Sequence, residues 1–333
     1  MDKDSRVKWL DVMKGVTILM VVLGHARLEL NFISRLCVGT HMPVFFFIGG
    51  VTLHEYDTFS SGVIHKLKAL IYPYVTCSVM YLIVYGLYSF FLKDDMSEFW
   101  NMFMQSIRFE GYGVLWFLPT LFGAEVLMLI FLQMHLKGSM IICSYFIFVF
   151  MAQNMGGYLN GIGWCYVLKR TLLAGIFILA GYFLKDILLN KKTIPWELIM
   201  VSGGGYAYLC HSFAEWFTFD LHYAVIPNMC QYLLLAICGI ITVMSVSMKI
   251  KGSFFSWIGE NSLCIMCTHY PIIWAVRQFV DPWKLYPLFH QFVVAGIVIL
   301  MEIGLVCVIN KKFRSVFYFP QRVSVRKEER KKQ

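Results

Sequence analysis

The chain has 333 residues, of which 59% are hydrophobic and only 15% are charged, and its mean hydropathy is +0.65. This composition is typical of a polytopic membrane protein. The formal net charge of +9 does not indicate a nucleic-acid partner, because the basic residues gather on alternate connections between apolar stretches. The ten cysteines do not indicate a disulfide framework, because cysteines such as Cys77, Cys143, Cys238, Cys264, Cys267 and Cys307 lie inside apolar stretches, where a thiol behaves as a small hydrophobic group.

The apolar stretches predict the number of membrane spans, since a transmembrane helix needs about 20 consecutive apolar residues. Ten stretches have roughly helical length, the fifth being short; they occupy residues 10–28, 37–54, 70–92, 114–134, 138–152, 164–184, 196–214, 223–248, 261–280 and 286–310. We therefore expect an all-α polytopic membrane protein with about ten transmembrane helices. We expect no cleavable signal peptide, because the first stretch lacks a small-residue cleavage site.

The distribution of Lys and Arg predicts the orientation of these spans. With both termini inside, 20 of the 29 Lys and Arg lie on inner segments and eight on outer segments, while Lys14 lies within the membrane. This positive-inside bias predicts cytoplasmic termini and a multi-pass protein of the inner (cytoplasmic) membrane. Residues 1–310 are expected to form one transmembrane domain, followed by a basic cytoplasmic tail, 311–333, that lies against anionic lipid.

The first stretch, Trp9 to Leu30, carries three ionisable side chains on nearly one helix face. Eleven residues separate Lys14 from His25, which in a helix places them within about 20° of each other and about 16 Å apart along the axis. Asp11 stands three residues before Lys14, so the two side chains can pair and lower the cost of each charge. Ionisable groups in a membrane are costly and indicate function. Imidazole accepts protons near neutral pH, so His25 is a candidate general base; the alternative is an interfacial histidine with a satisfied hydrogen bond.

The next two stretches each begin with a candidate site residue. His41 opens the second stretch, and a loop of about fifteen residues joins it to His25, so the two histidines can meet at the outer mouth. The alternative is that His41 is an ordinary histidine at the membrane interface. Lys66 and Lys68 precede the third stretch; they are either positive-inside charge or a cytoplasmic seat for an anionic cofactor, since Lys binds phosphate as a point charge.

Three residues of later stretches complete the candidates. Trp116 is either a belt aromatic at the membrane interface or part of a pocket. Glu125 lies nine residues further in, where a buried carboxylate needs a partner or a proton, and both structural pairing and catalytic support are open. His269 stands two residues before Pro271 within the ninth stretch and has either a packing or a chemical role. No group of residues has convincing metal-site spacing, so we expect no metal.

Four segments together resemble the acyltransferase 3 family of integral membrane acyltransferases, in the branch that resembles fucose 4-O-acetylases. They are WLDVMKGVTILMVVLGH, THMPVFFFIGG, LWFLPTLFGAEVL and FSWIGENSLCIMCTHYPI, and they span essentially the whole chain. Lys14 and His25 match the basic-x10-His pattern of the family, although Lys14 stands where many members have Arg, so the charge is kept and a bidentate contact is lost. The resemblance implies a ten-span helical fold and acetyl-CoA as the acyl donor.

These features predict an O-acyltransferase, most simply an O-acetyltransferase, of the cell envelope. We expect an acyl group to move from cytoplasmic acyl-CoA to a hydroxyl of an extracytoplasmic glycan or lipid-linked sugar. His25 is the expected base, oriented by His41 or Glu125; Asp11 and Lys14 form the charged stripe; Lys14, Lys66 and Lys68 hold the donor; Trp116 and His269 contact the acceptor. The alternatives are a proton-coupled secondary transporter and a non-catalytic partner in polysaccharide export, and for the enzyme an acetyl-His25 intermediate.

Overall fold

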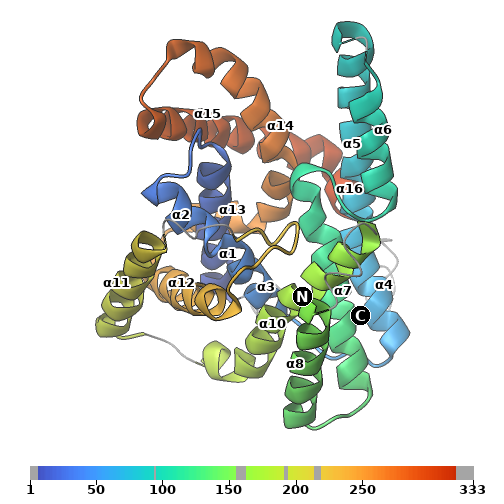
Figure 1. The fold of residues 1–333 in the computed structure, drawn as a ribbon, viewed down its shortest axis with the longest axis vertical. Helices are drawn as coiled ribbons and strands as arrows, with labels where there is room; N and C mark the ends of the chain where they lie inside the picture. Colours follow the sequence, from blue (N-terminus) through green and yellow to red (C-terminus); the bar gives the residue numbers. More distant parts are fainter. Residues whose placement is uncertain (1–6, 94, 155–162, 191–193, 214–218, 320–333) are drawn as a thin grey trace, which may run out of the picture.

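We describe the protein from a computed structural model, which covers residues 7–93, 95–154, 163–190, 194–213 and 219–319. The regular secondary structure of these residues is helical apart from one isolated bridge between Asp220 and Val225, so the expected all-α fold is confirmed. The α-helices are α1 (Lys8–His25), α2 (Phe32–Val38), α3 (His41–Val51), α4 (Phe59–Lys66), α5 (Tyr72–Tyr88), α6 (Ser97–Ile107), α7 (Phe117–Gln133), α8 (Gly138–Asn154), α10 (Gly163–Asn190), α11 (Trp196–Ser212), α12 (Met229–Lys249), α13 (Ser253–Glu260), α14 (Ser262–Val280), α15 (Pro287–Val308) and α16 (Arg314–Phe317) (Figure 1).

Each of the ten predicted stretches coincides with one or more of these helices. Among the described residues, six helical segments are long and apolar enough to cross a membrane, and Gly138–Met151 is a shorter apolar helix. α1 lies outside that set and contains three charged residues, Lys8, Asp11 and Lys14. The protein is therefore a multi-pass membrane protein, while the number of ten spans and the side on which the termini lie remain predictions.

Two spans differ from their predicted form. The second, predicted at 37–54, is a segment Phe32–Val51 that breaks between α2 and α3, so that His41 begins a new helix. Pro43 stands in the first turn of α3, where its missing N–H leaves no intrahelical bond unmade. The third, predicted at 70–92, begins earlier, at Phe59, and contains a π-helical turn, η2 (Leu67–Ile71), between α4 and α5. Turns of this kind are frequent at functional sites.

α1 lies at the centre of the bundle, where it packs against α13, α12, α14, α3 and α15 (Figure 1). Its inner contact with α13 is unusually close: a Cβ on Gly15 would overlap the carbonyl oxygen of Phe255, and a Cβ on Gly259 would overlap that of Asp11. α3 and α10 approach through Gly50 and Gly181 in the same way. These contacts fix the backbone of the two helices that carry His25 and His41.

The chain continues as helix beyond residue 310, where the membrane domain was expected to end. The π-helical turn η7 (Ile309–Phe313) leads into α16, and the hydroxyl groups of Tyr72 and Thr76 donate to the carbonyl oxygens of Ser315 and Val316. Phe317 is buried. Residues up to 319 therefore pack against α5, and the rest of the predicted basic tail lies outside the described residues.

Candidate functional site

Three histidines from three helices lie together at one end of α1. The ring centroid of His25 is 6.3 Å from that of His41 in α3 and 5.4 Å from that of His269 in α14. The ring of Tyr270 meets His25 edge-on at 5.8 Å. We refer to His25, His41 and His269 as the histidine cluster. The meeting of His25 with His41 that the sequence predicts is present, and His269 joins them.

The hydrogen bonds of the cluster fix the tautomers of two of its members. Nδ1 of His41 is 2.8 Å from the carbonyl oxygen of Cys37, and Nδ1 of His269 is 2.8 Å from that of Ile265. A carbonyl oxygen only accepts, so each Nδ1 carries a hydrogen and each neutral ring keeps an acceptor at Nε2. His41 and His269 are buried, and Nε2 of His269 has no hydrogen-bond partner among the described residues. His25 is half-buried, so it is the most accessible ring of the three.

At the opposite end of the helix, Asp11 and Lys14 form the pair that their spacing predicts. Lys14 Nζ is 3.7 Å from Asp11 Oδ1, and the Asp11 side chain is buried. Lys14 also lines a cavity of about 200 Å³. Phe45 and Met266, which stand four residues after His41 and three before His269, line the same cavity, together with Gly49, Ala69, Leu121 and Glu125. The cavity therefore lies beside Lys14 and comes within about one helical turn of His41 along α3 and of His269 along α14, although none of the three histidines is among its lining residues.

Glu125 in α7 forms an ion pair with Lys66. Its Oε2 is 3.0 Å from Lys66 Nζ, and the side chains of both residues are at most 10% exposed. This pair supplies the partner that a buried carboxylate needs. It also holds the Lys66 ammonium in the bundle interior, beside the cavity-lining residue Glu125, whereas Lys68 is exposed and its ammonium lies 5.0 Å from the Phe319 ring centroid. Of the three lysines predicted to hold the donor, Lys68 is exposed, Lys14 is partly exposed and Lys66 is buried.

A family model described as an acyltransferase domain, Acyl_transf_3, matches residues 7–309. The chain belongs to the acyltransferase 3 family. It is therefore a membrane enzyme that transfers acyl groups, and the match runs from α1 through α15. The match does not resolve the branch that resembles fucose 4-O-acetylases. No curated protein and no solved structure matches the chain.

Trp116 of this acyltransferase is buried rather than open to a ligand. It is 7% exposed; the ring of His222 stacks on it at 5.2 Å with 14° between the planes, and the Arg170 guanidinium lies 5.4 Å from its centroid. Burial, with the charge of Arg170 as a smaller cause, lowers the pKa of His222 to about 4, so this ring is neutral. Trp116 thus holds a loop, and its predicted contact with a substrate remains untested.

Arg170 connects the segments around Trp116 through its guanidinium. It is fully buried, and its Nη2 donates to the carbonyl oxygens of Phe109 and Glu110 at 3.0 and 2.9 Å, while Nη1 donates to that of His222 at 3.3 Å. The acyltransferase therefore has two loops, 108–112 and 219–228, joined through one guanidinium. No sequence pattern assigns this role to Arg170, and none marks His222 or Tyr270.

Among the described residues, no group of three or more His, Cys, Asp or Glu side chains is placed to hold a metal ion. The chemistry that these residues offer is proton transfer by imidazole and electrostatic stabilisation by lysine. Both fit acyl transfer to a hydroxyl.

Proposed function

We propose that the protein is an O-acyltransferase of the cytoplasmic membrane that moves an acyl group, most simply acetyl, from acyl-CoA to a sugar hydroxyl. In this proposal the lysine end of α1 faces the cytoplasm, and the histidine cluster faces a glycan or lipid-linked sugar on the other side. The observation that carries the proposal is the cavity that Lys14 lines and that also borders Phe45 and Met266, one helical turn from His41 and His269. In this proposal an extended donor enters the cavity at Lys14 and continues past it towards the base.

The donor would enter from the cytoplasmic side. Lys68 is exposed and basic, and in our proposal it contacts the CoA phosphates, while Lys14 lies deeper at the cavity. The largely apolar walls of the cavity suit the pantetheine arm, and the Lys66–Glu125 pair gives them a polar side. The thioester then reaches the region of His25.

The reaction would be direct attack. His25 removes the proton of the acceptor hydroxyl while the oxygen bonds to the thioester carbonyl carbon. The tetrahedral intermediate collapses, the C–S bond breaks, and the CoA thiolate takes the proton from the imidazolium. A positioned base contributes about 10²–10⁴-fold to such a step. His41 and His269, whose Nε2 atoms are acceptors, border His25.

The test is acyl transfer by purified protein in liposomes. With labelled acetyl-CoA and a surface-glycan acceptor, we expect acyl-CoA consumption and a labelled acceptor, and His25→Ala should lose at least about 10²-fold in kcat. His211→Ala is the matched control, because His211 is an exposed histidine at the end of another span. Movement of a solute without acyl-CoA consumption would indicate a transporter instead. Labelled acetyl trapped on His25 without an acceptor would replace direct attack by the covalent route.

A further inference from the structure

The first turn of α15 connects the outer ends of the two helices that carry His25 and His269. It contributes two adjacent buried side chains, His290 and Gln291, which are 1% and 0% exposed. His290 reaches the end of α14, and Gln291 reaches the end of α1. Neither residue contacts the cavity, so the catalytic proposal does not account for their burial.

Gln291 joins the last turn of α1 to the start of α2 through the two ends of its amide. Its Nε2 donates to the carbonyl oxygen of Leu23 at 2.7 Å, two residues before His25. Its Oε1 accepts from Asn31 Nδ2 at 2.8 Å and from the Ser34 hydroxyl at 3.3 Å. The last carbonyl groups of a helix lack intrahelical donors. Gln291 therefore supplies a donor to the turn that carries His25.

The orientation of the Gln291 amide follows from its neighbours. Asn31 is the N-cap of α2, and its Oδ1 accepts from the backbone N–H of Ser34 at 2.9 Å. Its Nδ2 is thus left to donate, and it can donate only to an oxygen of Gln291. The nitrogen of Gln291 must then face Leu23. The amide both donates to Leu23 and accepts from Asn31, which neither Leu nor an ionised Glu can do.

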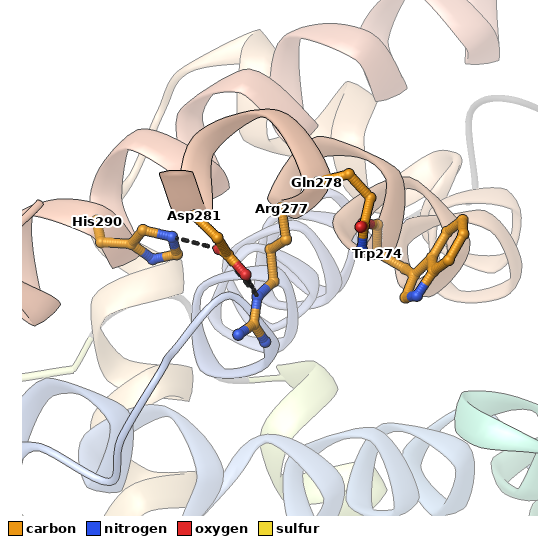
Figure 2. A network of polar contacts seen from close by, with 5 residues as sticks. All are labelled: Trp274, Arg277, Gln278, Asp281 and His290. Atoms are coloured by element: carbon orange, nitrogen blue, oxygen red, sulfur yellow. Dashed lines mark hydrogen bonds and ion pairs between the residues drawn. The ribbon is translucent and has the colours of Figure 1, made fainter. Parts of the chain in front are cut away.

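His290 joins the same turn to α14. Its Nε2 is 2.8 Å from Asp281 Oδ1, and Asp281 also receives Arg277 Nε at 3.4 Å. Figure 2 shows His290 and Arg277 reaching the Asp281 carboxylate from two sides. Asp281 directly follows α14, which carries His269. One turn of α15 thus holds the ends of both helices whose rings lie 5.4 Å apart.

We infer that Gln291 is a positioning residue for His25, acting through the Leu23 carbonyl and the Asn31–Ser34 pair. The inference rests on the proposed role of His25 as the base. A displacement of about 1 Å at a reacting group costs as much as 10²-fold in rate. Loss of the Gln291 amide frees the last turn of α1 and moves the imidazole without removing it.

The experiment compares Gln291→Leu with Gln278→Leu, an exposed glutamine of α14 whose side chain reaches only the carbonyl oxygen of Trp274 in its own helix. For Gln291→Leu we expect folded protein, a KM for acetyl-CoA within about twofold of wild type, and a kcat lowered by about 10- to 100-fold. The acidic limb of the pH profile of kcat/KM should shift as well, whereas Gln278→Leu should match wild type in all three.

A second variant guards against misfolding. Asn31→Asp keeps the cap to Ser34 but loses the donor to Gln291, so it should lower kcat by about three- to tenfold at unchanged KM. Gln291→Asn, whose amide is shorter, should recover less activity than wild type and more than Gln291→Leu. Loss of activity in proportion to the loss of folded protein, with an unshifted pH profile, would overturn the inference.

A readout without acyl transfer separates this inference from the proposed function. Diethyl pyrocarbonate modifies accessible neutral imidazoles, and peptide mass spectrometry gives its rate at His25 relative to His211. Gln291→Leu should change this ratio at least about twofold, since the exposure of His25 depends on its position. An unchanged ratio overturns the positioning role even if the wild type transfers acyl groups. If the wild type transfers no acyl groups but Gln291→Leu still changes the ratio, the positioning role of Gln291 stands while the proposed function fails.

Discussion

Glu125 is a carboxylate in the interior of α7, and Lys66 is the partner that makes its burial tolerable. Lys66 and Glu125 are far apart in the sequence. Their contact depends on the early start of the third span and on its π-helical turn. A buried pair stabilises little compared with an apolar pair, but either half alone is costly. The two lysines of this region therefore have different roles, Lys66 in the bundle interior and Lys68 at its surface.

Removal of one charge of this pair tests that role. Glu125→Gln should destabilise the protein by about 3–5 kcal/mol, because it leaves the Lys66 ammonium buried and unpaired. The double variant Glu125→Gln/Lys66→Met should be more stable than Glu125→Gln alone. Thermal unfolding in detergent gives the comparison, with Arg108→Gln, an exposed residue, as the control. Equal stability of the single and double variants would contradict the pair.

The exposed lysine has its own prediction. Lys68→Ala should weaken acetyl-CoA binding at low ionic strength, and the difference from wild type should shrink at high salt, because exposed charges are screened. Calorimetric titration at two salt concentrations measures both values, with Lys137→Ala as a control lysine on another connection. If Lys68→Ala binds acetyl-CoA at low salt as tightly as wild type does, Lys68 contributes only to the positive-inside charge bias.

At the scale of single elements, helix crossings decide whether the site forms. The crossing of α1 with α13 has no space for a side chain at Gly15 or Gly259. We expect Gly15→Ala to cost at least about 1–3 kcal/mol, because overpacking displaces backbone atoms. Gly204→Ala is the matched control: a Cβ there meets nothing within 4 Å, so the change should be neutral or stabilise α11 by up to about 1 kcal/mol. If the two variants have the same melting temperature, α1 and α13 do not pack as closely at Gly15 as described.

The two loops joined by Arg170 give a second prediction at this scale. Arg170→Lys keeps the charge, but its single nitrogen cannot take the two positions from which Nη1 and Nη2 reach the three carbonyl oxygens. Each hydrogen bond to a charged group contributes about 1.5–3 kcal/mol, so amide exchange in residues 219–228 should become at least about tenfold faster. Exchange in α12 serves as the internal reference. Unchanged amide exchange in residues 219–228 would show that Arg170 does not hold this loop in place.

The helices could be predicted from the sequence better than the breaks within them and the contacts between them. Apolar length was enough to predict a helix at each of the ten stretches, and a spacing of eleven residues was enough to place Lys14 and His25 on one face. The break before His41, the early start at Phe59 and the burial of Trp116 were not predictable, because each depends on partners distant in the chain. Trp116 is covered by His222, a residue of a loop with no distinguishing pattern. Helix propensity and hydropathy describe a segment, whereas these features belong to contacts between segments.

For the whole molecule, the orientation is the prediction with the widest consequences. The distribution of basic residues predicts that both termini lie in the cytoplasm, so a reporter fused after residue 333 and one inserted at residues 95–110 should report opposite sides of the membrane. The same side for both would reverse the proposed entry of the donor and overturn the assignment of spans. The insertion should be checked for retained acyl transfer, since α6 packs against α5.

The bond between Gln291 and Leu23 joins residues 268 positions apart, from the first span to the last. At about 5–20 residues per second, translation takes roughly 15–50 s to supply the second partner after the first. For nearly all of that time the chain carries His25 and His41 but neither His269 nor the donor from α15, since His269 is added only shortly before Gln291. If His25 is the base, as we propose, an unfinished chain would therefore carry it without the hydrogen bond that fixes the last turn of α1. The positioned base would form only after α15 has been added to the bundle.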